Sequence, residues 1–244
     1  IHVQTAMGMA KKLRIKPEQY ECGSHPPHDK ETREKGRKLN ATFSPFHNNC
    51  SGKHSGMLSL AKKLKADLAG YTHIEHPVQQ TIFNQIRKLT GYNHFQTGID
   101  GCSAPTPFLS LKTIADLFQK LGSGKYLELT KAYKAMAEHP YLIGGKNRFD
   151  TEFNSALKGR GICKAGGEAI RGIVIKTEKY GLVGIAIKVL DGNQRAIEVA
   201  TMATLKHLNV LKEEEKEKLQ RYKSKPLYNH SKIHIGDIKA EIKK

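Results

Sequence analysis

A thiol, an amine and an imidazole lie close together along the chain in NNCSGKHSG, residues 48–56. Cys50 and Lys53 are three residues apart, so they share one side of this segment if it is helical. A neighbouring lysine lowers the pKa of a thiol, and the resulting thiolate is a good zinc ligand. The same spacing also suits a buried thiol and a solvated lysine, so spacing alone leaves both interpretations open.

A second loop, DGCSAP at residues 100–105, contains Asp100 and Cys102. Two thiols on separate loops and a carboxylate can form a metal site, although no C-x-x-C pair makes this prediction specific. Lys188 follows in the apolar stretch LVGIAIKVL, where the alternation of a strand places it either in solvent or in a cleft. The pattern does not decide between these positions.

The lysine-containing loop does not fit a phosphate-binding loop. The motif G-x-x-x-x-G-K-[ST] requires glycine where the chain has His47, and serine or threonine where it has His54. The 41 basic and 23 acidic residues give a formal net charge of +18, but the charge is spread along the chain. We therefore expect no specific nucleic-acid partner. No apolar run approaches the roughly 20 residues that cross a bilayer, so we expect no membrane partner either.

Hydrophobic periodicity predicts an α+β protein. Helices are expected over residues 1–13, 31–39, 77–89, 109–121, 126–138 and 195–211, and a β-hairpin over residues 172–177 and 182–190. A further helix is expected up to Leu64, with Asn48 and Asn49 as its capping residues and Cys50 and Lys53 on its first turn. Helices grouped before a hairpin, without strand–helix alternation, favour α+β over a Rossmann arrangement. Residues 98–107 are expected to form an irregular loop. The four cysteines are too few for a disulfide scaffold, which favours a reduced, cytoplasmic setting.

The domain organisation predicted from these elements is one domain over residues 1–211 and a basic C-terminal segment over residues 212–244. The last part of that segment, residues 222–244, is expected either to be loosely held or to add a strand at His234–Ile238. The first helix runs into the start of the chain without a capping residue. We therefore expect the chain to be a fragment that lacks an N-terminal segment.

Six motifs, in order along nearly the whole chain, resemble the bacterial asparaginase II family of the Rhizobium type. They are ECGSHPP (21–27), HNNCSGKHSGML (47–58), EHPVQ (75–79), GIDGCSAPT (98–106), KAGGEAIRGI (164–173) and GIAIKVLDGNQRA (184–196). The resemblance implies a fold like that of serine β-lactamases, penicillin-binding proteins and glutaminases. It also implies hydrolysis of L-asparagine to aspartate and ammonia, and we expect a homodimer.

The resemblance also implies roles for individual residues. Cys50, Lys53 and Cys102 match the family's zinc ligands, although an amine must be neutral to bind a metal. Lys188 matches a catalytic strand lysine, and we expect it to point into the same cleft as Asp100 and Lys53. Asp100 lies beside the zinc ligands, where it can hold a water or the substrate's amino group, and Asp100 and His54 are assigned to substrate binding. His54 can also support a metal ligand.

The resemblance further implies a covalent mechanism in which a serine, activated by a lysine three residues later, attacks the amide carbonyl. The family carries these groups in RSxxK and SHSGE segments, which this sequence does not contain. Ser51 and Ser55 are not followed by lysine at the third position. We therefore expect little or no activity from residues 1–244, and recovery when about 80 to 90 upstream residues are restored.

Two further hypotheses come from other functional classes. In one, a zinc-dependent hydrolase activates water on the metal. In the other, a nonenzymatic basic protein binds an anionic partner, and its affinity falls with salt. Metal content and salt dependence of binding distinguish these hypotheses from the serine–lysine mechanism.

Overall fold

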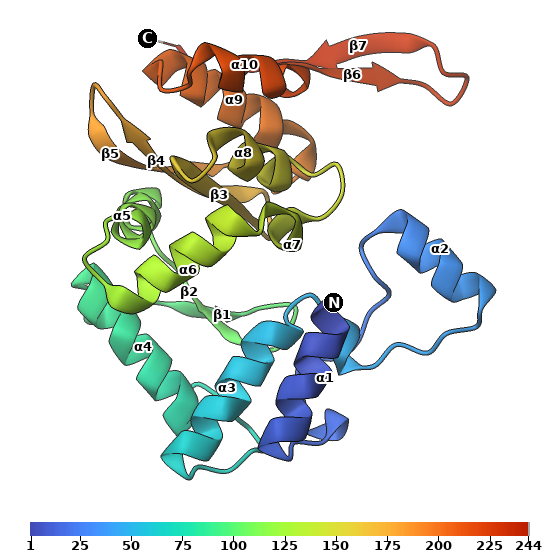
Figure 1. Ribbon diagram of the computed structural model, residues 1–244, viewed down its shortest axis with the longest axis vertical. Helices are drawn as coiled ribbons and strands as arrows, with labels where there is room; N and C mark the ends of the chain where they lie inside the picture. The colour runs from blue at the N-terminus through green and yellow to red at the C-terminus, as the bar shows by residue number, and fades with distance from the viewer. Residues whose placement is uncertain (244) are drawn as a thin grey trace. The chain divides into compact units, whose positions relative to one another are not determined.

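The computed structural model describes residues 1–243 and separates the chain into two compact units, Ile1–Leu109 and Ser110–Lys244 (Figure 1). The first unit contains helices α1 (His2–Leu13), α2 (Lys30–Lys38), α3 (Ser51–Leu64) and α4 (Pro77–Thr90), the short turns η1 (Pro17–Gln19) and η2 (Pro45–His47), and strands β1 (Thr97–Ile99) and β2 (Pro105–Pro107). Strands β1 and β2 form an antiparallel hairpin.

The second unit is built around a three-stranded antiparallel sheet of order β3-β4-β5. Its elements are α5 (Leu111–Gly122), α6 (Leu127–Glu138), α7 (Pro140–Gly144), α8 (Phe149–Leu157), β3 (Gly161–Gly166), β4 (Ile170–Thr177), β5 (Gly181–Lys188), η3 (Gln194–Ala196), α9 (Ile197–Leu208), α10 (Glu213–Lys218), η4 (Gln220–Tyr222), β6 (Lys225–Tyr228) and β7 (His234–Ile238). Helices combined with small antiparallel sheets confirm the predicted α+β class.

The start of α3 lies within two residues of the prediction, because Asn48 and Asn49 were predicted to cap it and Cys50 is its N-terminal cap. Other features differ from the sequence predictions. The loop expected over residues 98–107 contains the β1–β2 hairpin. Helix α8 and strand β3 were not predicted; β3 has only six residues and includes two glycines and a lysine, so its strand pattern is weak.

The core of the first unit lies between α1 and α3. Ala6 and Ala10 of α1 face Leu58 and Ala61 of α3, and all four side chains are buried. Because alanine adds little volume, the two helix backbones can approach closely at this point. This packing fixes the direction of α3, whose first turn carries the candidate site residues.

The two faces of the second unit's sheet pack against different helices. Ile173, Ile175 and Ile185 point to one face and join a buried cluster that includes Met202 and Leu205 of α9. The alternating residues point to the other face, which α5 covers (Figure 1). In Figure 1 the sheet therefore lies between α5 on one side and α8 and α9 on the other.

Two glycines allow α5 to lie directly on the sheet. A Cβ atom at Gly172 would overlap the ring of Phe118, and one at Gly184 would overlap the backbone carbonyl of Ala115. A ring can rotate away, but a helix backbone cannot move without shifting the whole helix. Gly184 is therefore the more restrictive of the two positions.

Gly184→Ala is expected to destabilise the protein by about 2–3 kcal/mol, since the added methyl group forces α5 away from the sheet. The measurement is urea unfolding followed by circular dichroism. Gly167→Ala is the matched control, because a Cβ atom at Gly167 meets nothing within 4 Å. Equal stability of both variants would contradict the close packing of α5 on β5.

The beginning of the predicted C-terminal segment packs into the second unit. Leu219 and Tyr222 belong to its buried core, and the carboxylate of Glu215 forms an ion pair with Arg160. The predicted strand at His234–Ile238 is confirmed as β7, which pairs with β6 across a register shift at Leu227 and Tyr228. The separation of residues 212–244 as a distinct segment stays a prediction, and its last residue, Lys244, lies outside the described residues.

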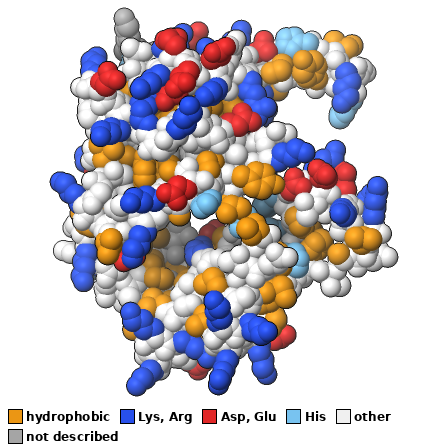
Figure 2. Space-filling view, viewed as in Figure 1, with side chains coloured by type: hydrophobic (Ala, Val, Ile, Leu, Met, Phe, Trp, Pro, Cys, Tyr) orange, Lys and Arg blue, Asp and Glu red, His pale blue; other side chains and the backbone are white. Residues whose placement is uncertain are grey.

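The surface carries its positive charge in a dispersed form. Figure 2 shows lysine and arginine side chains scattered over the visible face, interrupted by acidic and uncharged side chains. Among residues 1–243, no helix combines the length and the apolar character that spanning a membrane requires.

Candidate functional site

The first turn of α3 is held in place by Asn48. Its side-chain amide donates to the carbonyl oxygen of Cys22 at 2.7 Å, and its side-chain oxygen accepts the backbone N–H of Cys50 at 2.8 Å. Because Asn48 is itself buried, both bonds are shielded from water. This arrangement fixes Cys50, the N-terminal cap of α3, and with it the direction of the Lys53 side chain one turn later.

The β1–β2 turn presents the second half of the site. The backbone N–H of Asp100 donates to Ala104 at 2.9 Å, and that of Ser103 donates to Asp100 at 2.9 Å. Ser103 adopts a left-handed conformation with φ 70°, which lets the chain reverse in few residues. The turn therefore holds Asp100 and Cys102 at the tip of the hairpin.

Four predicted site residues meet where this turn approaches α3. The Sγ atoms of Cys50 and Cys102 and a carboxylate oxygen of Asp100 all lie within 4.8 Å of one another. The amine of Lys53 is 3.4 Å from Oδ2 of Asp100, and the Cys102 thiol donates to the same oxygen at 3.5 Å. Cys102 is buried, whereas the side chains of Lys53 and Asp100 are each 47 % exposed. We call these four residues the thiol cluster.

The thiol cluster contains one basic group among three acidic ones. Burial raises the pKa of the Cys50 thiol, and the ammonium of Lys53 only partly opposes this effect. Burial lowers the pKa of Lys53, but its hydrogen bond to Cys102 and the nearby acidic groups outweigh burial and raise the pKa. Burial also acts to raise the pKa of Asp100, yet the N–H of Gly101 and the charge of Lys53 lower it. The cluster thus favours a charged lysine beside a charged carboxylate.

His54 lies beside the cluster residues on α3, and its ring is completely buried. Burial lowers its pKa to about 4, so the imidazole is neutral at pH 7. Nδ1 of His54 is 2.6 Å from the hydroxyl of Tyr71, while Nε2 has no hydrogen-bond partner among the described residues. The predicted contact of His54 with a substrate stays a prediction, because a completely buried ring touches a ligand only if the surrounding chain moves.

A chain of hydrogen bonds holds the ring of His54. The backbone N–H of Glu21 donates to the Tyr71 oxygen at 2.8 Å, and the Tyr71 hydroxyl shares a hydrogen bond with Nδ1 of His54. The Glu21 carboxylate in turn accepts the backbone N–H of Gly70 at 2.5 Å and of Thr72 at 3.1 Å. Glu21 and Tyr71 therefore position His54 behind the thiol cluster.

Tyr71→Phe is expected to destabilise the protein by about 1–3 kcal/mol, because it leaves the Glu21 N–H and Nδ1 of His54 buried without partners. Guanidinium unfolding measures this effect. Tyr141→Phe is the control, since Tyr141 is exposed. A Tyr71→Phe variant as stable as this control would show that the hydrogen-bond chain does not hold His54 in place.

Lys188, the remaining predicted site residue, belongs to the second unit. It is the last residue of β5, not the middle of a longer strand as predicted. Its amine donates to the carbonyl oxygens of Glu168 at 2.5 Å and Val189 at 2.7 Å. Glu168 and Ala169 both have positive φ, at 57° and 50°, so Lys188 anchors a strained turn between β3 and β4. Its expected place in one cleft with Asp100 and Lys53 stays a prediction.

Residues 1–240 match the family model of L-asparaginase II. The chain belongs to the L-asparaginase II family. The match confirms the resemblance carried by the six sequence motifs and assigns the chain to a family of amidohydrolases. No curated protein matches the chain significantly.

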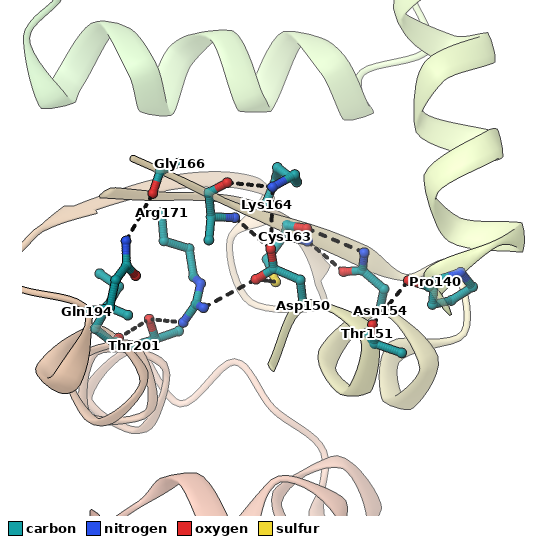
Figure 3. A network of polar contacts seen from close by, with 12 residues as sticks. Pro140, Asp150, Thr151, Asn154, Cys163, Lys164, Gly166, Arg171, Gln194 and Thr201 are labelled. Carbon is teal, nitrogen blue, oxygen red and sulfur yellow. Dashed lines mark hydrogen bonds and ion pairs between the residues drawn. The ribbon is translucent and has the colours of Figure 1, made fainter. Parts of the chain in front are cut away.

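A polar network in the second unit of this L-asparaginase II chain was not predicted (Figure 3). Arg171, only 3 % exposed, forms an ion pair with Asp150 at 3.2 Å and donates to Thr201 at 3.1 Å. Asp150 also accepts the backbone N–H of Ala165 at 2.7 Å. The network joins α8, β3, β4 and α9. An arginine in an otherwise apolar strand indicates a buried polar partner, but nothing in the sequence identifies Asp150 as that partner.

The same network includes a second lysine, Lys164 on β3. Its amine donates to the carbonyl of Ala165 at 2.6 Å and lies 3.9 Å from the Asp150 carboxylate (Figure 3). Lys164 pairs in register with Gly172, and Lys188 with Ile170, so both lysines belong to the same face of the sheet. Lys164 is the first residue of the motif KAGGEAIRGI, but it was not selected as a site residue.

Two serines in the chain that were not among the predicted site residues are followed by a lysine three residues later. Ser59 precedes Lys62 on α3, and Ser155 precedes Lys158 at the end of α8. The hydroxyl of Ser59 donates to the carbonyl of Ser55 at 2.7 Å. Neither serine belongs to the RSxxK or SHSGE pattern of the asparaginase II resemblance, because Leu58 and Asn154 precede them.

Proposed function

We propose that this chain takes part in hydrolysis of the side-chain amide of L-asparagine, and that the thiol cluster forms a zinc- and substrate-binding site. The family match supports the reaction class. The observation that supports the site is the convergence of Cys50, Asp100 and Cys102 within 4.8 Å. Residues separated by about 50 positions in the sequence would not bring two thiols and a carboxylate together without a fold that places them.

The donors present suit zinc, with one condition. Thiolates are common zinc ligands, and the thiols of Cys50 and Cys102 leave two further positions of a tetrahedral site for Lys53 and for water. Lys53 can fill one of them only after losing its proton, whereas its raised pKa favours the charged form. Zinc that is bound here would supply a positive charge able to polarise an amide carbonyl.

Asp100 is the group best suited to hold the substrate's amino group. Its side chain is half exposed, and the lowered pKa of the carboxyl keeps it negatively charged. The N–H of Gly101, at 2.7 Å from Oδ1, orients one carboxylate oxygen and leaves Oδ2 facing Lys53. The carboxylate can therefore accept a hydrogen bond from an ammonium group while Lys53 remains close to the substrate.

The serine–lysine route is the mechanism we propose for the chemical step. It requires a nucleophilic serine with a base within hydrogen-bond reach, about 2.6–3.2 Å. Residues 1–244 contain neither RSxxK nor SHSGE, and the Ser55 hydroxyl is buried and donates to Ser51. We therefore propose little or no ammonia release by this chain alone, and substantial release when the two family segments are joined to its N-terminus.

Lys188 is the proposed catalytic lysine of that extended enzyme, and Lys188→Met is expected to lower kcat by about 100-fold or more. The measurement is ammonia release from L-asparagine. Lys164→Met is the matched comparison, because Lys164 lies on the same face of the sheet. A larger loss in Lys164→Met than in Lys188→Met would transfer the catalytic role to Lys164. Equal activity with and without the joined segments would overturn the serine–lysine route.

A further inference from the structure

A cleft of about 430 Å³ opens in the second unit beside α6, the end of α5 and the loop that follows α8. Helix α6 lines it with Thr130, Tyr133, Lys134, Ala137 and Glu138, which recur at helical spacing and form one face. None of the residues of α6 is fully buried. The face that a surface helix normally packs against its core is here left partly open to the cleft.

Three charged side chains line the cleft without an ion pair among the described residues. They are Lys134 and Glu138 of α6 and Lys158, the residue that follows α8. By contrast, Lys131 on another face of α6 is 3.1 Å from Glu128. The cleft therefore combines two positive groups and one negative group whose charges the chain leaves available.

Backbone donors lie at the same place. Lys158 ends α8 in a left-handed conformation, with φ 48° and ψ 44°, and its N–H and that of Gly159 bond to no described group. Asn209 ends α9 in the same conformation, but its N–H donates to Leu205. A helical residue followed by a left-handed one directs successive N–H groups into a concave nest that binds anions.

The loop that contains Lys158 and Gly159 is held against α6. The hydroxyl of Tyr133 donates to the carbonyl of Gly159 at 2.9 Å, which holds the loop and the helix face together. A Cβ atom at Gly159 or Gly124 would meet nothing within 4 Å, so the cleft is open at these two lining positions. This hydrogen bond therefore limits how far the loop and α6 can move relative to each other at the cleft.

We propose that this cleft binds a small α-amino acid with an acidic side chain. The two lysines and the N–H groups of Lys158 and Gly159 match carboxylates. Glu138 matches the ammonium group, and Leu121 and Ala137 offer apolar surface to the carbon chain. An inorganic anion would leave Glu138 without a partner and would use none of the apolar lining. The volume falls within the range of small-molecule sites.

The test is a titration of the ¹⁵N-labelled chain with L-aspartate, followed by the amide resonances of Gly124, Lys158 and Gly159. Saturable shifts at these three amides are expected. Lys134→Met and Lys158→Met should each weaken the binding about tenfold or more, because each removes a charge-assisted hydrogen bond. Lys131→Met, which removes a charge elsewhere on α6, should leave the affinity unchanged. Binding in the first unit would shift other amides and would not depend on Lys134 or Lys158.

One further variant and one further ligand complete the titration experiment. Ala137→Phe should fill the cleft and abolish the shifts while preserving the circular dichroism spectrum. Inorganic phosphate should produce much weaker shifts, since it cannot use Glu138 or the apolar lining. Absence of saturable shifts with L-aspartate, equal binding of phosphate, or full affinity in both lysine variants would each overturn the proposal.

Discussion

Cys102→Ser is expected to reduce the zinc content of the purified protein from about one ion per chain to a trace. Zinc binding at a cysteine site is worth roughly 12 kcal/mol near neutral pH, shared among about four ligands. Loss of one thiolate should therefore cost about 3 kcal/mol, or roughly 100-fold in affinity. The measurement is metal analysis by inductively coupled plasma mass spectrometry after dialysis, combined with competition against a chromogenic chelator.

Cys50→Ser should lose zinc in the same way, because its Sγ atom lies within 4.8 Å of the other donors. Cys163→Ser is the matched control, since Cys163 is buried in the second unit beside Asp150. It should retain zinc. Stoichiometric zinc in the Cys50 and Cys102 variants, or none in the unmodified chain, would show that the thiol cluster is not a zinc site.

Arg171→Met is expected to destabilise the second unit by about 3–5 kcal/mol. Asp150 is 5 % exposed, so removing Arg171 leaves a carboxylate in the interior without its main countercharge. The substitution also removes the guanidinium group, which lies 4.1 Å from the ring centre of Phe149. Urea unfolding measured by circular dichroism gives the change in free energy.

Two comparisons separate the cost of an unpaired charge from general damage to the core. Lys164→Met should cost less than about 1 kcal/mol, because its amine is half exposed and 3.9 Å from Asp150. The double variant Asp150→Asn/Arg171→Met should be more stable than Arg171→Met alone, since the unpaired charge is gone. A double variant less stable than Arg171→Met would contradict this explanation.

Most of the helices and the β4–β5 hairpin could be predicted from the periodicity of hydrophobic residues in the sequence. Helices α4 and α5 carry regular apolar faces and recognisable caps, and the β4–β5 hairpin is rich in isoleucine and valine, so their positions were predicted. Strand β3 was missed because its pattern is short and interrupted. The start of α3 was predicted to within two residues, because the side chains of Asn48 and Asn49 favour a helix cap at this point.

The candidate site was predicted unevenly for a similar physical reason. Cys50 and Lys53 share one turn of α3, so local spacing brings them together. Their meeting with Asp100 and Cys102 depends on tertiary contacts, and only the family resemblance connected the two loops. The hydrogen bond between Tyr71 and His54 spans 17 residues and has no signature in the sequence. Such a partner becomes visible only when the fold is known.

The β6–β7 hairpin extends away from the body of the second unit and offers two unpaired strand edges (Figure 1). An isolated two-stranded sheet gains little stability in water, so its amide hydrogens should exchange quickly and its edges should often be accessible. Exposed edges can recruit strands from other molecules and begin aggregation. Pro226 removes one backbone donor, and the register shift at Leu227 and Tyr228 interrupts the regular ladder. Both features oppose the pairing of a second chain with these strand edges. The local sequence therefore limits aggregation at edges that no other strand covers.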